Sequence, residues 1–327
     1  MIPFAWLEEA SIRVTPNIRI TPITYDPEFQ LYLKWENRQV TGSFKVRGAI
    51  NKVLTLQPWE RERGLVAASA GNHGQGVAMA GNLVQALVTV FCPENAVPIK
   101  VAAIRGLGAT VRFVPGGYGE AEQAGIQYAA ESGSTWISPY NDGQVISGQG
   151  TLALEAFRQE PAVRTATWVV PAGGGGLISG IGAAIKGQLK TTRLIGVQSE
   201  ASAFLYHLYK GGSQAGVPDY LSLADGLAGP VEPNSLTIPL VHHYVDHFVL
   251  VSESEIKWAI ALAWQRYGEI IEGSAATTLA AIIAGKIDAR PAVLVISGGN
   301  IQPEVHAQII SEMPSPLEGL PLRGLDS

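Results

Sequence analysis

The sequence predicts an α/β protein in which helices cover both faces of a mostly parallel sheet. Three observations support this prediction. Short apolar runs alternate along the chain with longer segments of helical character, as in a series of strand and helix pairs. The runs are apolar throughout, which is typical of strands that are buried on both faces. Glycine-rich or polar clusters directly follow three of the runs, where an open α/β sheet binds its ligands.

The predicted strands are short and rich in β-branched residues, and valine occurs in every one of them. They cover residues 64–68, 86–91, 110–114, 168–172, 193–198, 247–251 and 292–296. The predicted helices lie between these strands and cover residues 119–131, 150–159, 177–189, 253–267 and 275–284. The stretch 211–239 is rich in glycine, proline and serine, so we expect a long loop or a lid that runs over the surface.

Length, charge and cysteine content narrow the function. The chain has 327 residues, enough for one large or two coupled α/β domains. A formal net charge of -5 and the absence of a basic run argue against nucleic acid as a partner. The single cysteine, Cys92, lies in an apolar run and is expected to pack as a small core residue. Because a lone cysteine cannot form an internal disulfide, we expect a protein of the reducing cytoplasm. No segment approaches the roughly 18 consecutive apolar residues that cross a bilayer, so membrane insertion is not expected.

Three clusters that follow predicted strands are expected to converge on one crevice. They are residues 69–74, 173–176 and 297–300. The second cluster consists of four successive glycines, whose free N–H groups at the start of a helix would suit a phosphate group. A flexible turn is the ordinary meaning of a glycine run, but the position between strand and helix favours phosphate. The run fits neither a Walker loop nor the dinucleotide-binding glycine pattern.

Two charged residues have both a functional and an ordinary interpretation. Lys45 stands among small residues beside an aromatic one, where desolvation would lower its pKa and suit it to form a Schiff base with a carbonyl cofactor. An isolated lysine is otherwise a solvated surface charge. Glu200 follows a strand where a dinucleotide-binding fold places its ribose carboxylate, which leaves a nicotinamide enzyme as an alternative. We prefer the ordinary interpretation of Glu200, a charge at the start of a helix.

Four motifs in order along the chain resemble those of the threonine dehydratase and serine racemase family. They are SFKVRGA at 43–49, SAGNHGQG at 69–76, GGGG at 173–176 and SGGN at 297–300, with further matches at 148–151 and 272–275. The resemblance implies the tryptophan synthase β-type fold of pyridoxal-phosphate enzymes, with two doubly wound, mostly parallel sheets. It also implies a homo-oligomer, namely a dimer. Within each chain, a small domain (63–141) would be inserted in a large domain (1–62 and 142–327), with pyridoxal 5'-phosphate bound between the two domains.

The resemblance assigns catalytic roles to Lys45 and Ser69. Lys45 would carry the cofactor and, once free, act as general base. The residues expected to bind the cofactor are Lys45, Phe44, Asn72, Gly173, Gly174, Gly175, Gly176, Leu177, Glu272 and Ser297. The residues expected to hold the substrate carboxylate are Ser69, Ala70, Gly71, Asn72 and His73. Without the resemblance, Ser297 would be interpreted as a strand-end cap and Asn72 as an Asx turn.

Differences from the motifs of cysteine synthases and serine racemases reduce the number of reactions that the sequence supports. Cysteine synthases usually have aspartate where Val46 stands and threonines in the phosphate loop, so sulfur transfer is disfavoured. Serine racemases of the eukaryotic type have a serine where Ala70 stands, and tend to have asparagine where Tyr140 stands. Their divalent-ion ligands are replaced here by Gln198 and Phe204. We therefore expect proton transfer on one face of the substrate and no divalent metal site, while a monovalent ion remains open.

The sequence thus predicts a pyridoxal-phosphate-dependent threonine or serine dehydratase, an ammonia-lyase that gives a 2-oxo acid and ammonia. Serine racemase and a dehydratase for hydroxylated acidic amino acids are alternatives within the family. A nicotinamide-dependent oxidoreductase and a catalytically dead scaffold are alternatives outside it. About 30 residues follow the last predicted strand, too few for the regulatory domain of biosynthetic threonine dehydratases, so feedback inhibition by isoleucine is not expected.

Overall fold

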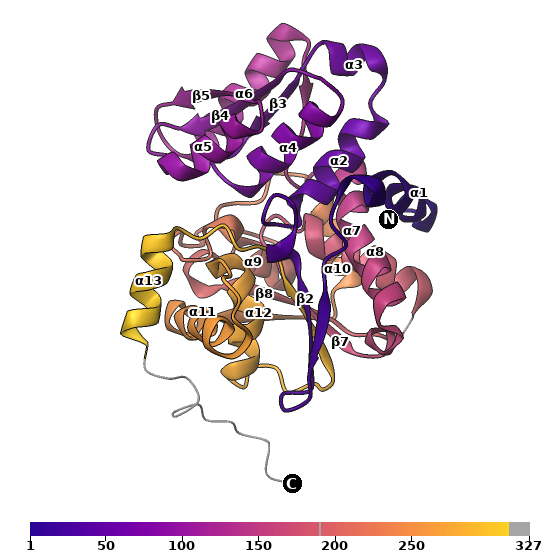
Figure 1. Ribbon diagram of the computed structural model, residues 1–327, viewed down its shortest axis with the longest axis vertical. Helices are drawn as coiled ribbons and strands as arrows, with labels where there is room; N and C mark the ends of the chain where they lie inside the picture. Colours follow the sequence, from indigo (N-terminus) through magenta and orange to yellow (C-terminus); the bar gives the residue numbers. More distant parts are fainter. Residues whose placement is uncertain (190, 314–327) are drawn as a thin grey trace.

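The fold contains two separate sheets with helices around them (Figure 1). The structure is a computed structural model and describes residues 1–189 and 191–313. The larger sheet has six strands in the order β1-β2-β10-β7-β8-β9, and the smaller has four in the order β5-β4-β3-β6. Both sheets are parallel except for the antiparallel pairing of β1 with β2. The predicted α/β class and the two mostly parallel sheets are therefore confirmed.

The large sheet is built from strands far apart in the sequence. Its strands are β1 (Ile23–Asp26), β2 (Leu31–Trp35), β7 (Thr167–Pro171), β8 (Leu194–Ser199), β9 (His247–Val251) and β10 (Ala292–Ile296). Alternate residues of β10 serve two hydrophobic cores: Val293 and Val295 lie in one cluster, and Leu294 and Ile296 in the other. Because each face of the strand is covered by a core, the strand contains no polar residue, as the apolar run predicted.

The small sheet lies in the part of the molecule remote from α13 (Pro303–Glu312) in Figure 1. Its strands are β3 (Leu65–Ala68), β4 (Val88–Pro93), β5 (Thr110–Val114) and β6 (Thr135–Trp136). The helices that accompany it are α4 (Asn72–Leu83), α5 (Pro98–Gly106) and α6 (Tyr118–Ser132). Cys92 is fully buried in the core beneath this sheet, and burial raises the pKa of its thiol to about 11. Its predicted role as a small core residue is confirmed.

Most of the remaining helices pack around the large sheet or between the two sheets, whereas α3 (Pro58–Glu62) lies in the upper part of the molecule with the small sheet (Figure 1). The others are α1 (Phe4–Val14), α2 (Lys45–Thr55), α7 (Gly143–Gln159), α8 (Gly176–Gln188), α9 (Phe204–Gly211), α10 (Thr237–Tyr244), α11 (Glu253–Tyr267) and α12 (Gly273–Ile283). Figure 1 shows α2 at the junction of the upper and lower halves of the molecule. Among the described residues, no helix combines the length and apolar character needed to cross a membrane.

All seven predicted strands are present, with ends that differ by up to two residues, but three observed strands were missed. β1 and β2 contain charged residues, and β6 has only two residues. The expectation that 211–239 runs over the surface is wrong in part: this stretch includes η5 (Asp225–Leu227), and Leu227, Val231 and Ser235 are buried. It packs against the glycine loop that follows β7, as described below.

Candidate active site

The start of α2 is held against the loop that follows β10. The N–H of Phe44 donates to the carbonyl of Ser297 at 3.0 Å, and Ser43 forms a β-bridge with Gly298. Lys45 is the first residue of the helix, so these contacts place its side chain beside the carboxyl end of the large sheet. Two motifs that are about 250 residues apart in sequence therefore meet at this end of the sheet.

The amine of Lys45 is held in a water-poor position. Its Nζ donates to the carbonyl of Pro139 at 3.0 Å and lies 5.4 Å from the centroid of the Phe44 ring. Burial lowers the pKa of Lys45 to about 8, although the nearby charge of Glu272 opposes this effect. A substantial fraction of the amine is therefore neutral near physiological pH, and a neutral amine is both a nucleophile and a base.

The loop after β3 forms the amino-terminal end of α4. Ser69, Ala70 and Gly71 make up the loop, and the helix starts at Asn72. The Oγ of Ser69 accepts a hydrogen bond from the N–H of Gly71 at 3.1 Å. Unpaired N–H groups and the helix dipole make such a helix start suitable for a carboxylate.

His73 lies on the buried side of this helix start. Its Nε2 lies 2.8 Å from the carbonyl of Ile137, and since a carbonyl can only accept, Nε2 carries the proton. Burial, reinforced by the charge of Lys45, lowers the pKa of His73 to about 3, so the ring is neutral at physiological pH. His73 thus anchors the loop after β3 to the segment that holds the Lys45 amine and is not an acid in this range.

A hydrogen-bonded group joins three loops around the site. Glu272, at the start of α12, accepts from Nδ2 of Asn72 at 2.7 Å and from the N–H of Asn300 at 3.2 Å. Nδ2 of Asn300 in turn donates to Oδ1 of Asn72 at 2.6 Å. Burial, followed by the charge of Asp225, raises the pKa of Glu272 to about 7. This group ties the loop after β10 to α4 beside the small sheet.

The four glycines after β7 have no room for side chains. A Cβ added to Gly174 would lie 2.4 Å from Cδ1 of Tyr140, and one added to Gly176 would lie 2.9 Å from Cβ of the same tyrosine. Gly175 has φ 87°, which L-residues with side chains rarely adopt. The loop leads into α8, so its N–H groups have the arrangement that binds phosphate at a helix start.

The structure brings the predicted site residues together, but the side chain of one of them, Leu177, points into the core. Lys45 connects to the glycine loop through Pro139 and Tyr140, and to Ser297 through Phe44. Ser297 is 3% exposed at the end of β10. The side chain of Leu177 belongs to the hydrophobic core under the glycine loop, which leaves only its backbone N–H for a ligand.

Some neighbours of the site were not predicted from the sequence. Oγ1 of Thr237 donates to the carbonyl of Gly174 at 2.7 Å, and the N–H of Glu232 donates to Oη of Tyr140 at 2.9 Å. Thr237 and Glu232 come from the stretch 211–239, in which no periodic pattern marks a residue as buried. The sequence marks Tyr140 only as a departure from racemases and gives no sign that it packs on the glycine loop.

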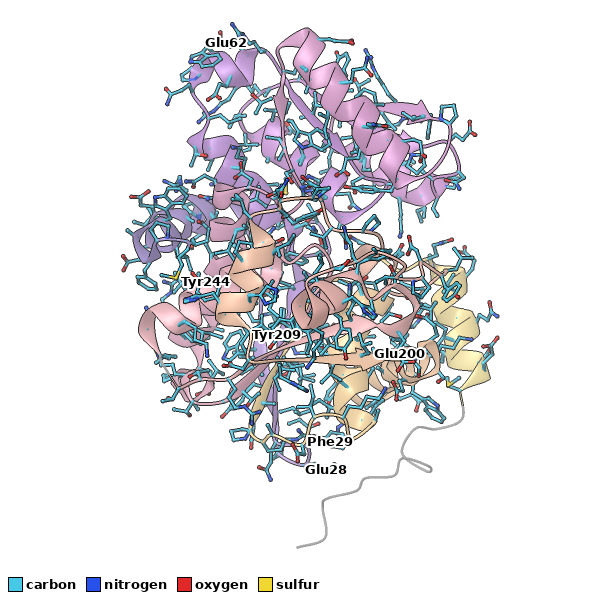
Figure 2. The ribbon with its side chains drawn as sticks, turned by 180° about the vertical axis from the view of Figure 1, so that it is seen from behind. Glu28, Phe29, Glu62, Glu200, Tyr209 and Tyr244 are labelled. Atoms are coloured by element: carbon cyan, nitrogen blue, oxygen red, sulfur yellow. The ribbon has the colours of Figure 1, made fainter. Side chains whose placement is uncertain are left out.

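Glu200 has the ordinary environment that the sequence favoured. It lies in the first turn of η4 (Glu200–Ser202), and its exposed carboxylate is 3.5 Å from Nζ of Lys286. Figure 2 shows it in the lower half of the molecule, with Glu62 marking the upper half. Within the described ranges, no group of three or more His, Cys, Asp or Glu side chains is placed to hold a metal ion.

Comparisons with known proteins agree with the geometry. A family model described as pyridoxal-phosphate dependent enzyme matches residues 9–298. The L-threonine ammonia-lyase of Geobacter sulfurreducens is 38% identical over 319 residues, 95% of this chain and 78% of that protein. The L-threonine ammonia-lyase of Thermotoga maritima is 41% identical over 285 residues, 86% of this chain and 70% of that protein. Maize serine racemase has a similar solved structure, with a TM-score of 0.87, 28% identity, and coverage of 94% of this chain and 96% of that chain.

Proposed function

The chain belongs to the family of pyridoxal-phosphate dependent enzymes, and from this premise we propose that it removes water from threonine or serine to give a 2-oxo acid and ammonia. The single observation that carries the proposal is the desolvated Lys45 amine, linked through Pro139 and Tyr140 to a glycine loop that fits a phosphate. The two ammonia-lyases named above support the choice of reaction within the family.

Lys45 would hold the cofactor and then act on the substrate. Pyridoxal phosphate, when bound, supplies an electron sink for the electrons that remain when Cα loses its proton. When its amine is free and neutral, Lys45 would take the proton from Cα of the substrate, and the hydrogen bond to the Pro139 carbonyl would orient the amine. The β-hydroxyl would then leave with a proton as water, and hydrolysis of the resulting enamine would give ammonia and the 2-oxo acid.

The remaining residues would bind and orient. The N–H groups of residues 173–176 would hold the cofactor phosphate, Phe44 would back the ring and Asn72 would contact its phenolic oxygen. Glu272 would not contact the cofactor ring itself but would orient Asn72, from which it accepts a hydrogen bond. Ser297 would offer a neutral hydroxyl to the pyridine nitrogen, where a carboxylate would hold that nitrogen protonated; this favours prompt elimination over transamination. The loop that begins at Ser69 would hold the substrate carboxylate at the start of α4.

A serine racemase is the second candidate, because maize serine racemase has a similar structure. Racemisation needs a proton donor on each face of Cα. Lys45 serves one face, and the position at which racemases of the eukaryotic type carry a serine is occupied by Ala70, which has no proton to give. This difference favours elimination.

We also propose the domain division and assembly implied by the resemblance. Residues 63–141 would form the small domain, which contains all four strands of the small sheet, and would move relative to the remainder when substrate binds. A homodimer in the cytoplasm is the expected form, and size-exclusion chromatography with light scattering measures the oligomeric state.

Two measurements test the proposed function. The purified protein is expected to show a visible absorption band, and borohydride reduction should abolish the band and add the mass of the reduced cofactor to the peptide that contains Lys45. Incubation with L-threonine or L-serine should release ammonia and 2-oxobutanoate or pyruvate in equal amounts. A protein with no adduct on this peptide and no 2-oxo acid from either substrate would contradict the proposal.

A further inference from the structure

The side chain of Asn300 links the loop after β10 of the large sheet to the start of α4 beside the small sheet. Nδ2 of Asn300 donates to Oδ1 of Asn72, the first residue of α4, at 2.6 Å. The N–H of Asn300 donates to Oε2 of Glu272 at 3.2 Å, so its backbone is held as well. Asn300 therefore contacts both other members of the hydrogen-bonded group around Asn72.

The orientation of the Asn300 amide is fixed by an acceptor. Nδ2 of Asn300 donates to the carbonyl of Thr41 at 2.9 Å, and a carbonyl can only accept. Nδ2 therefore lies on the side of Thr41, and its second hydrogen reaches Asn72. Gly42 makes room for the amide, because it has φ 70° and a Cβ on it would overlap Oδ1 of Asn300. The amide of Asn300 thus has one orientation that satisfies its partners.

The orientation of the Asn72 amide follows from that of Asn300. Because Nδ2 of Asn300 can only donate, the atom of Asn72 that faces it is the carbonyl oxygen. Nδ2 of Asn72 then faces Glu272, to which it donates at 2.7 Å, and its second hydrogen is left for a ligand. A reversed Asn72 amide would bring two donor groups together and lose both hydrogen bonds.

Glu272 by itself does not dictate this orientation. Burial, followed by the charge of Asp225, raises the pKa of Glu272 to about 7, so part of the population carries a proton on this group near physiological pH. A protonated carboxyl group can donate as well as accept, and it tolerates either orientation of the Asn72 amide. Asn300 does not titrate, and it presents the same donor to Asn72 in both states.

We propose that Asn300 is a positioning residue, which turns an N–H of Asn72, and not its carbonyl, toward the phenolic oxygen of the cofactor. This inference rests on the proposed function, in which Asn72 contacts that oxygen. An N–H stabilises the ionised form of the oxygen, whereas a carbonyl favours the form that keeps its proton. The bound cofactor absorbs visible light in the first form and near-ultraviolet light in the second, so the orientation of the amide has a spectroscopic signature.

Absorption spectra of the holoenzyme test this role. Asn300→Ala removes the donor and should lower the ratio of visible to near-ultraviolet absorption by about threefold or more, because part of the population loses the hydrogen bond to the ionised oxygen. Asn300→Asp keeps the shape of the side chain but offers acceptors to Asn72, so it should reverse the Asn72 amide and lower the ratio by about tenfold or more. Equilibrium dialysis should show weaker cofactor binding in both variants.

Asn37 provides the matched control, because it supports the same loop through other partners. A Cβ on Gly299 would lie 3.0 Å from Cβ of Asn37, and Nδ2 of Asn37 donates to Oε2 of Glu269 at 2.7 Å. Asn37→Ala and Asn37→Asp make the same two changes beside this loop without removing a partner of Asn72. They should lower the stability to urea and leave the absorption ratio unchanged.

The absorption ratio decides the outcome. An unchanged ratio in a folded, cofactor-loaded Asn300→Ala or Asn300→Asp variant would overturn this inference even if cofactor affinity falls, because a merely structural role weakens binding without changing the ionisation of the bound cofactor. An equal change of the ratio in the Asn37 variants would overturn it as well. Neither result bears on the proposed function, which fails instead if the unmodified protein releases no 2-oxo acid from threonine or serine.

Discussion

Individual residues in this site owe their chemistry to burial and to one or two neighbours. Lys45 would be an ordinary ammonium group on the surface, but burial lowers its pKa to about 8. The same physics lowers the pKa of His73 to about 3 and raises that of Glu272 to about 7. Lys45 is thereby brought within reach of physiological pH, where a fraction of its amine is neutral, whereas the neutral ring of His73 is hydrogen-bonded to Ile137.

Replacement of Lys45 by alanine should abolish 2-oxo acid production. The loss should exceed the roughly 100- to 10,000-fold that is typical of a general base, because cofactor attachment is lost together with the base. Turnover is measured by ammonia release under saturating cofactor. Lys210→Ala, which removes an exposed lysine on α9, is the control and should retain normal activity. Near-normal turnover in Lys45→Ala would refute the proposed mechanism.

Capture of the cofactor by the apo-protein should increase with pH and level off above about 8. Only the neutral amine attacks the carbonyl, and the lowered pKa of Lys45 places its deprotonation there instead of near 10.5. The initial rate of adduct formation, trapped with borohydride at a series of pH values, gives the midpoint. Glu272→Gln should move the midpoint to lower pH, because the charge of Glu272 raises the pKa of Lys45. A midpoint near 10.5 would show that the amine is not desolvated.

Ala70→Ser should introduce measurable racemisation at some expense to elimination. A hydroxyl at this position would supply a proton donor on the face of Cα opposite Lys45, if it comes within the roughly 2.6–3.2 Å of a hydrogen bond. Chiral chromatography of the remaining amino acid detects the D-enantiomer. The unmodified protein is the control and should form little of it; abundant D-serine from the unmodified protein would contradict proton transfer on one face.

At the scale of secondary structure elements, the site depends on how strands end and helices begin. The glycine loop passes from β7 into α8, and α4 starts directly after the loop that follows β3. In both places unpaired N–H groups point along a helix axis toward the region where an anion would bind. Tyr140 packs so closely on the glycine loop that a Cβ at Gly174 would overlap its ring. The loop is therefore restricted to glycine by its neighbour.

Gly174→Val should weaken cofactor binding more than it weakens folding. The added side chain would displace Tyr140 or the loop, and loss of a hydrogen bond to a charged phosphate, worth about 1.5–3 kcal/mol, corresponds to roughly 10- to 100-fold in affinity. Equilibrium dialysis measures the affinity and urea denaturation the stability. Gly211→Val is the matched control, because no atom lies within 4 Å of a Cβ at that position. Unchanged cofactor affinity in a folded Gly174→Val variant would place the phosphate elsewhere.

At the scale of the whole molecule, a buried network of charges fixes α2 between the large sheet and α7. Arg47 donates to Glu36 at 2.7 and 2.8 Å and to Glu155 at 3.0 and 3.1 Å. Lys34, on β2, donates to Glu155 at 2.5 Å. All four side chains are buried, and the attraction between opposite charges offsets the cost of removing them from water only while every partner is present. The network therefore holds the helix that starts with Lys45.

Arg47→Met should destabilise the protein by about 3–5 kcal/mol, because it leaves two buried carboxylates without their main partner. Urea denaturation measures the free energy of unfolding. Arg193→Met, an equivalent change on the surface, should alter that free energy by no more than about 0.5 kcal/mol. A loss below about 1 kcal/mol in Arg47→Met would mean that the network does not hold α2 in place.

The sequence by itself determined the fold class, the cofactor and the order of the motifs. Strands such as β3, β7 and β10 were predictable because strands that are covered on both faces must be apolar throughout, and that requirement is visible in the chain. β5 is mostly exposed and contains Arg112, so its β-branched residues and not its burial made it predictable. The family was predictable because the lysine motif and the glycine run are continuous segments whose chemistry depends on adjacent residues. Strands β1 and β2 were not predictable, because they contain charged residues whose hydrogen-bonding partners are distant in sequence.

Only the tertiary structure decided which side chains surround Lys45 and the glycine loop. The contacts of Glu232 with Tyr140 and Asn141 span about 90 residues, and that of Lys45 with Pro139 spans 94. Contacts over such separations follow from how the two sheets and their loops pack, and leave no periodic pattern in the chain. The values to which the pKa of Lys45 and Glu272 shift have the same origin, because desolvation depends on every atom that excludes water from a group, whichever part of the chain supplies it.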